Sequence, residues 1–208
     1  IYIGGKSWLR FAWMPLVLIF LWVVGARGAD KATENMIYET ESSYNYIQVI
    51  EEGSYRYLRL NEGQGMHSIY HPTILNYRGP WSQVLVAPFF NDAPHKMASL
   101  DKLAILGLAA GTTARQANIV YEDIKIDGFE IDPKIVEVGR KYFDLNLPNL
   151  QVTVQDARWG LAHSEEHYDV ISVDAYRPPY IPWHMTTVEF FNMVHDHLSN
   201  DGVLVINI

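Results

Sequence analysis

The chain has 208 residues, enough for one domain of ordinary size and a short appendage. Hydrophobic residues make up 49% of the chain and aromatic residues 13%, which excludes an intrinsically disordered protein. The absence of cysteine excludes disulfides and thiolate metal sites, and the net charge of −8 disfavours nucleic acid as a partner, because phosphates need a basic surface.

Residues 1–31 are predicted to form a membrane anchor with its flanks. Phe11–Ala26 carries no charged side chain, and with the apolar residues before it this segment approaches the ~20 residues that span a bilayer. Two alternatives stay open, a secretory signal peptide cleaved near Ala26 and a buried core helix. The anchor predicts a single-pass membrane protein, whose remaining part faces the cytoplasm if it is an active enzyme.

Residues 32–79 are predicted to hold a linker and a small antiparallel sheet. The polar stretch Ala29–Ser43 indicates the linker. Strand-forming residues then occupy Tyr44–Ile50, Tyr55–Leu60 and Met66–Tyr70, with glycine-containing turns between them.

Residues 80–208 are predicted to form a Rossmann-like domain, because strand patterns alternate with helix patterns. The expected strands are Leu103–Leu108, Ile124–Ile131, Leu150–Val154, Asp169–Val173 and Val203–Ile208. The expected helices cover Trp81–Ala87, Thr112–Tyr121, Pro133 to Tyr142 and Thr186 to Leu198. This alternation predicts an α/β fold with a doubly wound, mainly parallel sheet. The chain stops inside the fifth strand, so we expect further strands outside this chain, or a partner that covers the edge.

A turn of small residues follows the first strand of this domain. Gly107, Ala109 and Gly111 allow backbone N–H groups to approach a ligand closely. Glu130 lies 23 positions after Gly107, at the end of the next strand, where a carboxylate binds the hydroxyls of a ribose. This unit predicts a site for an adenosine-bearing cofactor.

Two further carboxylates follow the next two strands. Asp156 comes after the third strand and Asp174 after the fourth, so both are expected at the carboxyl edge of the sheet beside Glu130. Asp156 is predicted to accept a hydrogen bond from an adenine amino group, with Ala157 packed nearby. Asp174 is predicted to face the reacting end of the cofactor. Each of these acids also suits an ordinary turn or helix cap.

The same segments resemble the spermidine synthase family. The similarity lies in Ile105–Arg115, Gly128–Asp132, Val154–Asp156 and Tyr168–Asp174, which occur in the family's order. The upstream strands resemble that family's N-terminal sheet, so the similarity covers about residues 40–208. The resemblance implies the fold of class I S-adenosylmethionine-dependent methyltransferases.

The resemblance also implies a site for S-adenosylmethionine or its decarboxylated form. Glu130 and Asp156 would bind the nucleoside, and Asp174 corresponds to the base that deprotonates the attacking amine. Gln64 and Tyr70, in the segment similar to the N-terminal sheet, become candidate substrate contacts.

Four positions depart from the family's pattern, and the mildest change is Ala109 in place of the middle glycine of the turn. Ala110 stands where the family has an aspartate that holds the amine end of the cofactor, and Arg177 replaces a second aspartate that binds the diamine. Pro72 follows Tyr70-His71 in place of a glutamate. Asp174–Thr187 is instead similar to spermidine synthase-like proteins attached to membrane segments, whose substrate is undefined, so polyamine synthesis is not inferred.

Two functional hypotheses follow. In the first, the protein transfers a methyl or aminopropyl group, with Asp174 as base and with Tyr176, Arg177 and His184 as substrate contacts. In the second, it is a catalytically inactive accessory subunit, tethered by Phe11–Ala26 to a larger respiratory or photosynthetic membrane complex.

No metal site is predicted. The spacing of His163 and His167 matches a zinc peptidase motif, but this short polar segment has no third ligand in view.

Overall fold

The computed structural model describes residues 11–26, 33–61, 65–91, 100–176 and 181–207. The chain divides into two compact units, Ile1–Glu34 and Asn35–Ile208. The candidate site residues predicted above all belong to the second unit.

The first unit corrects the predicted membrane anchor. Its helix α1 (Met14–Ala26) has 13 residues, which rise about 20 Å, whereas the hydrocarbon core of a bilayer is about 30 Å thick. Within the described ranges, no helix combines the length and the apolar character needed to cross a membrane. The single-pass anchor over Phe11–Ala26 and the membrane localisation drawn from it are therefore wrong.

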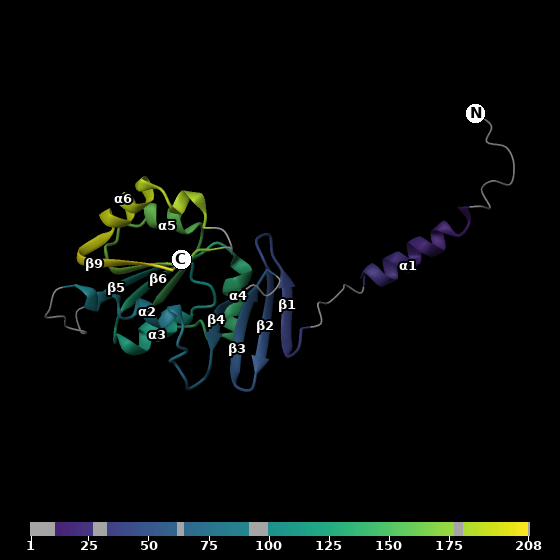
Figure 1. Cartoon of the computed structure of the whole chain (residues 1–208), viewed down its shortest axis with the longest axis horizontal. Helices are drawn as coiled ribbons and strands as arrows, with labels where there is room; N and C mark the ends of the chain where they lie inside the picture. Colours follow the sequence, from purple (N-terminus) through teal and green to yellow (C-terminus); the bar gives the residue numbers. More distant parts are fainter. Residues whose placement is uncertain (1–10, 27–32, 62–64, 92–99, 177–180, 208) are drawn as a thin grey trace, which may run out of the picture. The chain divides into compact units, whose positions relative to one another are not determined.

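The second unit begins with an antiparallel sheet in the order β1-β2-β3-β4 (Figure 1). Its strands are β1 (Met36–Glu41), β2 (Tyr46–Glu52), β3 (Tyr55–Leu60) and β4 (Met66–Tyr70). The sequence predicted β2, β3 and β4 but assigned the region of β1 to a linker. None of the residues of β1 is fully buried, so this edge strand carries no apolar alternation that would reveal it.

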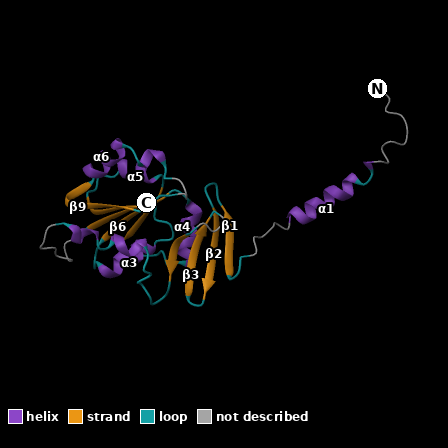
Figure 2. Ribbon diagram, in the orientation of Figure 1, coloured by secondary structure: helices purple, strands orange, loops and turns teal. Residues whose placement is uncertain are grey.

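A parallel sheet in the order β7-β6-β5-β8-β9 follows (Figure 2). Its strands are β5 (Lys102–Leu106), β6 (Lys125–Glu130), β7 (Leu150–Val154), β8 (Tyr168–Val173) and β9 (Leu198–Ile206). All four neighbouring pairs are parallel, as predicted. The strand order reverses beside β5, which has β6 on one side and β8 on the other. Such a switch point is where open α/β sheets bind ligands.

Helices cover both faces of the parallel sheet (Figure 1). One face packs against α2 (Pro80–Val84) and α3 (Thr112–Val120), with the short 3-10 helix η2 (Ala87–Phe90) after α2. The other face packs against α5 (Ala157–Ala162) and α6 (Val188–Asp196), and the 3-10 helix η4 (Trp183–Met185) precedes α6. The sequence did not predict α5, because six residues are too few to establish a helical period.

Helix α6 begins at Val188, two residues after the predicted start at Thr186. Thr187 is the N-cap, and its hydroxyl accepts a hydrogen bond from the Phe190 N–H. The cap still satisfies a backbone donor that the helix itself leaves without a partner.

Helix α4 (Pro133–Tyr142) joins the two sheets of the second unit. Its apolar side chains Ile135 and Val138 pack in one cluster with Ile47 and Leu58 of the antiparallel sheet. This contact removes apolar surface of α4 and of the antiparallel sheet from water. The antiparallel sheet is therefore packed against the parallel domain through α4.

Asp132 ties the β1–β2 turn to the first turn of α4. It is fully buried, and its Oδ1 accepts a hydrogen bond from the Lys134 N–H at 3.0 Å as the helix N-cap. Its Oδ2 accepts from Ser42 Oγ at 2.5 Å and from Asn45 Nδ2 at 2.9 Å. One carboxylate thus accepts a hydrogen bond from the first turn of α4 and also holds the β1–β2 turn of the antiparallel sheet in place.

Asp132→Ala is expected to lower the free energy of unfolding by about 2–4 kcal/mol, because a helix cap is lost and buried donors are left without partners. Chemical denaturation measures the change. Asp101→Ala, at an exposed position, is the control and should change stability by about 0.5 kcal/mol or less. Equal stability of the two variants would contradict the role assigned to Asp132.

Candidate active site

A cavity of about 230 Å³ opens at the carboxyl ends of β5, β6 and β8. Eight of the predicted site residues line it: Gly107, Ala109, Glu130, Asp156, Ala157, Asp174, Tyr176 and His184. Most of the remaining lining is apolar, which is typical of sites for small organic ligands. The three separated carboxylates predicted to meet at the sheet edge do share one cavity.

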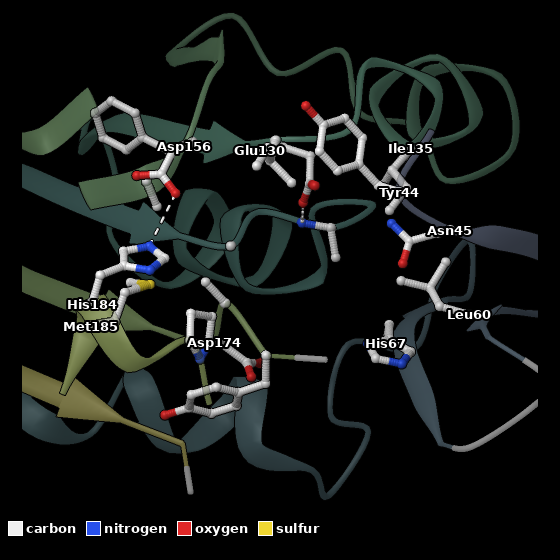
Figure 3. Close-up of a pocket in the computed structure, with 18 residues that line it drawn as sticks. Tyr44, Asn45, Leu60, His67, Glu130, Ile135, Asp156, Asp174, His184 and Met185 are labelled. Atoms are coloured by element: carbon white, nitrogen blue, oxygen red, sulfur yellow. Dashed lines mark hydrogen bonds and ion pairs between the residues drawn. The ribbon is translucent and has the colours of Figure 1, made fainter. Parts of the chain in front are cut away.

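The labelled side chains fall into three groups (Figure 3). Asp156, His184 and Met185 lie on one side of the view, with Glu130 and Asp174 in the middle. The opposite side carries residues from the antiparallel sheet and its turn, together with one residue of α4: Tyr44, Asn45, Leu60, His67 and Ile135. Both sheets therefore contribute to the cavity.

Glu130 is held by the backbone around it. Its Oε2 accepts a hydrogen bond from the Ala109 N–H at 2.9 Å and its Oε1 accepts from the Asp132 N–H at 3.0 Å. The side chain is 8% exposed, and burial raises its pKa while the two N–H donors oppose that rise. Each oxygen keeps a second lone pair, so this carboxylate can also accept hydrogen bonds from vicinal hydroxyls.

The turn after β5 packs closely against the end of β8. Gly107 has φ +98°, and a Cβ placed there would lie 2.5 Å from the carbonyl oxygen of Asp174. Only glycine fits this left-handed, crowded position. The contact brings the turn after β5 and Asp174 together at the switch point.

The N–H groups of this turn bond within the protein. Gly107 and Leu108 donate to the Phe129 carbonyl, and Ala109 donates to Glu130. Ala110 donates to Ser68 Oγ, and the Gly111 N–H donates to the Leu108 carbonyl. The sequence predicted N–H groups available to a ligand, but in the structure these donors organise the turn itself.

Asp156 has two hydrogen-bond partners in the structure. Its Oδ1 accepts from the Trp159 N–H at 2.9 Å as the N-cap of α5. Its Oδ2 lies 3.2 Å from His184 Nε2. Arg158 donates to the His184 carbonyl oxygen, which holds this residue beside α5. The pair Asp156–His184 therefore forms one polar wall of the cavity.

Asp174 follows β8 and is largely buried. Asn207 Nδ2 donates to its Oδ1 at 3.0 Å. Burial raises the pKa of Asp174, and the hydrogen bond from Asn207 partly opposes that rise. Its Oδ2 accepts no hydrogen bond from the described residues. A carboxylate with one oxygen held and the other available is suited to accept a proton from a ligand.

Sequence reasoning missed several residues of the site. Tyr44, Asn45 and His67 reach the cavity from the antiparallel sheet, and Asn207 contacts Asp174 from the end of β9. The pattern Ser42-x-x-Asn45 in a turn was a usable signal, since such side chains often bond to nearby backbone or to a helix start. No signal in the sequence connected His67 with Asp174.

Other predicted residues lie elsewhere. Gly111 is outside the cavity and packs closely against Leu145, and Tyr70 has the Arg115 guanidinium 4.3 Å from its ring centroid. Ala110 is 2% exposed and packs in the cluster that α4 shares with the antiparallel sheet. The predicted contacts Gln64 and Arg177 lie outside the described residues.

The chain matches the Spermine/spermidine synthase domain over residues 95–207, more than half of its length. A probable polyamine aminopropyl transferase of Bifidobacterium longum is 38% identical over 177 residues, which cover 83% of this chain and 37% of that protein. A polyamine aminopropyltransferase of Vibrio vulnificus is 27% identical over 207 residues, which cover 93% of this chain and 66% of that protein. The chain therefore spans only part of the length of each relative.

Two solved structures share the fold. A probable spermidine synthase from Corynebacterium glutamicum has a TM-score of 0.70 at 23% identity, with 81% of this chain and 62% of that chain covered. A spermidine synthase in complex with the transition state analogue AdoDATO has a TM-score of 0.63 at 20% identity, with 83% of this chain and 56% of that chain covered. The chain belongs to the spermine/spermidine synthase domain family, as the resemblance in its sequence predicted.

Asp174→Asn is expected to raise the free energy of unfolding at pH 7. The folded chain binds the proton of Asp174 more tightly than the unfolded chain does, because the pKa of Asp174 is raised by folding. The stability that this proton contributes is fully present below the unfolded pKa of about 3.9. It is lost as pH rises through the raised pKa of the folded chain. The advantage of the variant should therefore vanish at about pH 3.

Urea denaturation at neutral and acidic pH measures this difference. Asp101→Asn, at an exposed position, is the matched control and should show no such gain. A variant of Asp174 that is less stable than the unchanged protein at pH 7 would contradict the assignment.

Proposed function

We propose that the protein is a transferase of the spermidine synthase type, which moves an alkyl group from a nucleoside sulfonium donor to an amine. The observation that carries this proposal is the cavity at the switch point, where Glu130, Asp156 and Asp174 meet. Glu130 would accept hydrogen bonds from the ribose hydroxyls, and the Asp156–His184 pair would contact the adenine. Asp174 would lie at the reacting end.

The charges of the cavity favour decarboxylated S-adenosylmethionine over S-adenosylmethionine. The three ionisable acids of the described lining are Glu130, Asp156 and Asp174, and that lining contains no lysine or arginine. A donor with an ammonium and no carboxylate suits such walls, whereas an additional ligand carboxylate would be repelled. Relatives named polyamine aminopropyltransferases support the same choice. We therefore infer aminopropyl transfer.

When bound, the sulfonium group of the donor supplies the carbon that the amine nitrogen attacks. The bond from this carbon to sulfur breaks as the new carbon–nitrogen bond forms, and sulfur keeps the electron pair. Asp174 accepts a proton from the incoming ammonium, which frees the nitrogen lone pair, and later releases that proton to water. The product nitrogen leaves as a secondary ammonium, so charge is conserved. The raised pKa of Asp174 makes it a better proton acceptor than an exposed aspartate.

The hypothesis of an inactive accessory subunit is not favoured. It depended on a membrane anchor over Phe11–Ala26, and the described residues contain no spanning helix. The proposed partner subunits stay a prediction that no observation supports. The cavity, which gathers three carboxylates within a largely apolar lining, instead favours an enzyme.

Glu130→Gln is expected to weaken binding of decarboxylated S-adenosylmethionine by about 10–100-fold, because charge-assisted hydrogen bonds to the ribose are lost. Calorimetric titration of the full chain measures the affinity. Glu137→Gln, which changes an exposed carboxylate on α4, is the control and should bind as the unchanged protein does. Thermal unfolding of both variants separates lost affinity from lost fold. No heat with the unchanged protein at millimolar ligand would refute the proposed function.

Asp174→Asn is expected to lower kcat by about 10²–10⁴-fold, because the proton acceptor is removed. Donor affinity should fall much less than kcat, since the ribose and adenine contacts remain. In the unchanged protein, activity should fall as pH drops through the raised pKa of Asp174, because protonation removes the base. Asp196→Asn, at an exposed position of α6, is the control. Full activity of the Asp174 variant would remove this residue from the mechanism.

A further inference from the structure

A second cavity of about 160 Å³ also has Asp174 in its wall. It shares four lining residues with the first cavity: His67, Ala109, Asp174 and Tyr176. The rest of its described wall is Gly65, Met66, Pro80, Trp81 and Asn207. We call it the acceptor cavity. Asp174 is thus common to both cavities, and it can accept a proton from a group in the acceptor cavity while the donor lies in the first one.

The described wall of the acceptor cavity carries one carboxylate, that of Asp174. One of its oxygens accepts a hydrogen bond from Asn207, and the other accepts none from the described residues. Burial lowers the pKa of His67, so this side chain is neutral at physiological pH. The described wall therefore offers one negative charge to a ligand.

The remaining wall suits an apolar ligand body. Trp81 is buried at 8% exposure, and Met66 at the start of β4 is 48% exposed. Pro80 completes this side. Aromatic and thioether groups gain free energy by covering a hydrocarbon or aromatic chain, and they offer no strong acceptor to a charged group.

We propose that the acceptor cavity binds a primary monoamine with an apolar body, and that Asp174 binds its amino group. This inference rests on the proposed transferase function and names its acceptor. Among the described residues of this wall, a second ammonium, as in a diamine, would find no carboxylate to pair with it. A charge that is desolvated without a partner is unfavourable by several kcal/mol.

A matched pair of acceptors tests the proposal: butylamine and 1,4-diaminobutane differ by the second amino group. With the full chain and decarboxylated S-adenosylmethionine, the nucleoside thioether released is measured at a pH where both amines are fully protonated. We expect kcat/KM for butylamine to exceed that for 1,4-diaminobutane by about tenfold or more, the factor that 1.4 kcal/mol produces. A preference for the diamine, or equal use of both, would overturn the inference.

A change of wall charge gives an independent test. Met66→Glu adds a carboxylate to the wall, and Met66→Gln adds a neutral group of the same size. The glutamate variant should shift the ratio of kcat/KM toward the diamine by about tenfold, and the glutamine variant should not. Melting temperatures confirm that both variants fold. An unchanged ratio in folded Met66→Glu, or the same shift in both variants, would contradict the inference.

Donor binding separates this inference from the function on which it rests. Calorimetric titration with decarboxylated S-adenosylmethionine needs no acceptor. Absence of binding refutes the transferase function itself. Binding of the donor without turnover of either amine overturns the monoamine inference and leaves the nucleoside site standing.

Discussion

The structure of the site depends on one buried carboxylate, that of Glu130. Its two oxygens accept backbone hydrogen bonds from Ala109 and from Asp132. It therefore joins the turn after β5 to the segment that opens α4, across the end of β6. A buried carboxylate without such donors would be costly, so the chain must keep both N–H groups directed at it. This requirement fixes the floor of the cavity and leaves the outer lone pairs for a ligand.

Asp132 extends the same arrangement to the other sheet. Its carboxylate caps α4 and binds Ser42 and Asn45, so the β1–β2 turn lies beside the cavity that Glu130 lines. The antiparallel sheet, which carries no predicted catalytic group, therefore contributes to the first cavity through Tyr44 and Asn45. Through His67 it contributes to both cavities. Its packing on α4 makes the shape of the site a property of both sheets.

The candidate acids could be found from the sequence because the end of each apolar run shows where a strand ends. Glu130, Asp156 and Asp174 each follow an apolar run, and parallel strands place such residues at one edge. The roles of their partners could not be read in this way. The Asp156–His184 pair joins residues 28 positions apart, and the Asp174–Asn207 pair joins residues 33 apart. Such contacts depend on the strand order, which local patterns do not specify.

The sequence by itself determined the order of the strands and of the α-helices other than α5 in residues 100–207, because apolar periodicity and turn residues are local properties. It also determined the family, through motifs that stand in order along the chain. Local patterns did not reveal the edge strand β1 or the short helix α5, and the apolar run near the N-terminus predicted a longer helix than α1. Only the tertiary structure decided that the N–H groups of the glycine turn donate to acceptors of the protein itself, and that Asp174 lines two cavities. Both outcomes arise from packing between segments that are distant in the sequence. Whether a group is buried there, and which partner its hydrogen bond finds, depends on several segments at once and not on the local sequence.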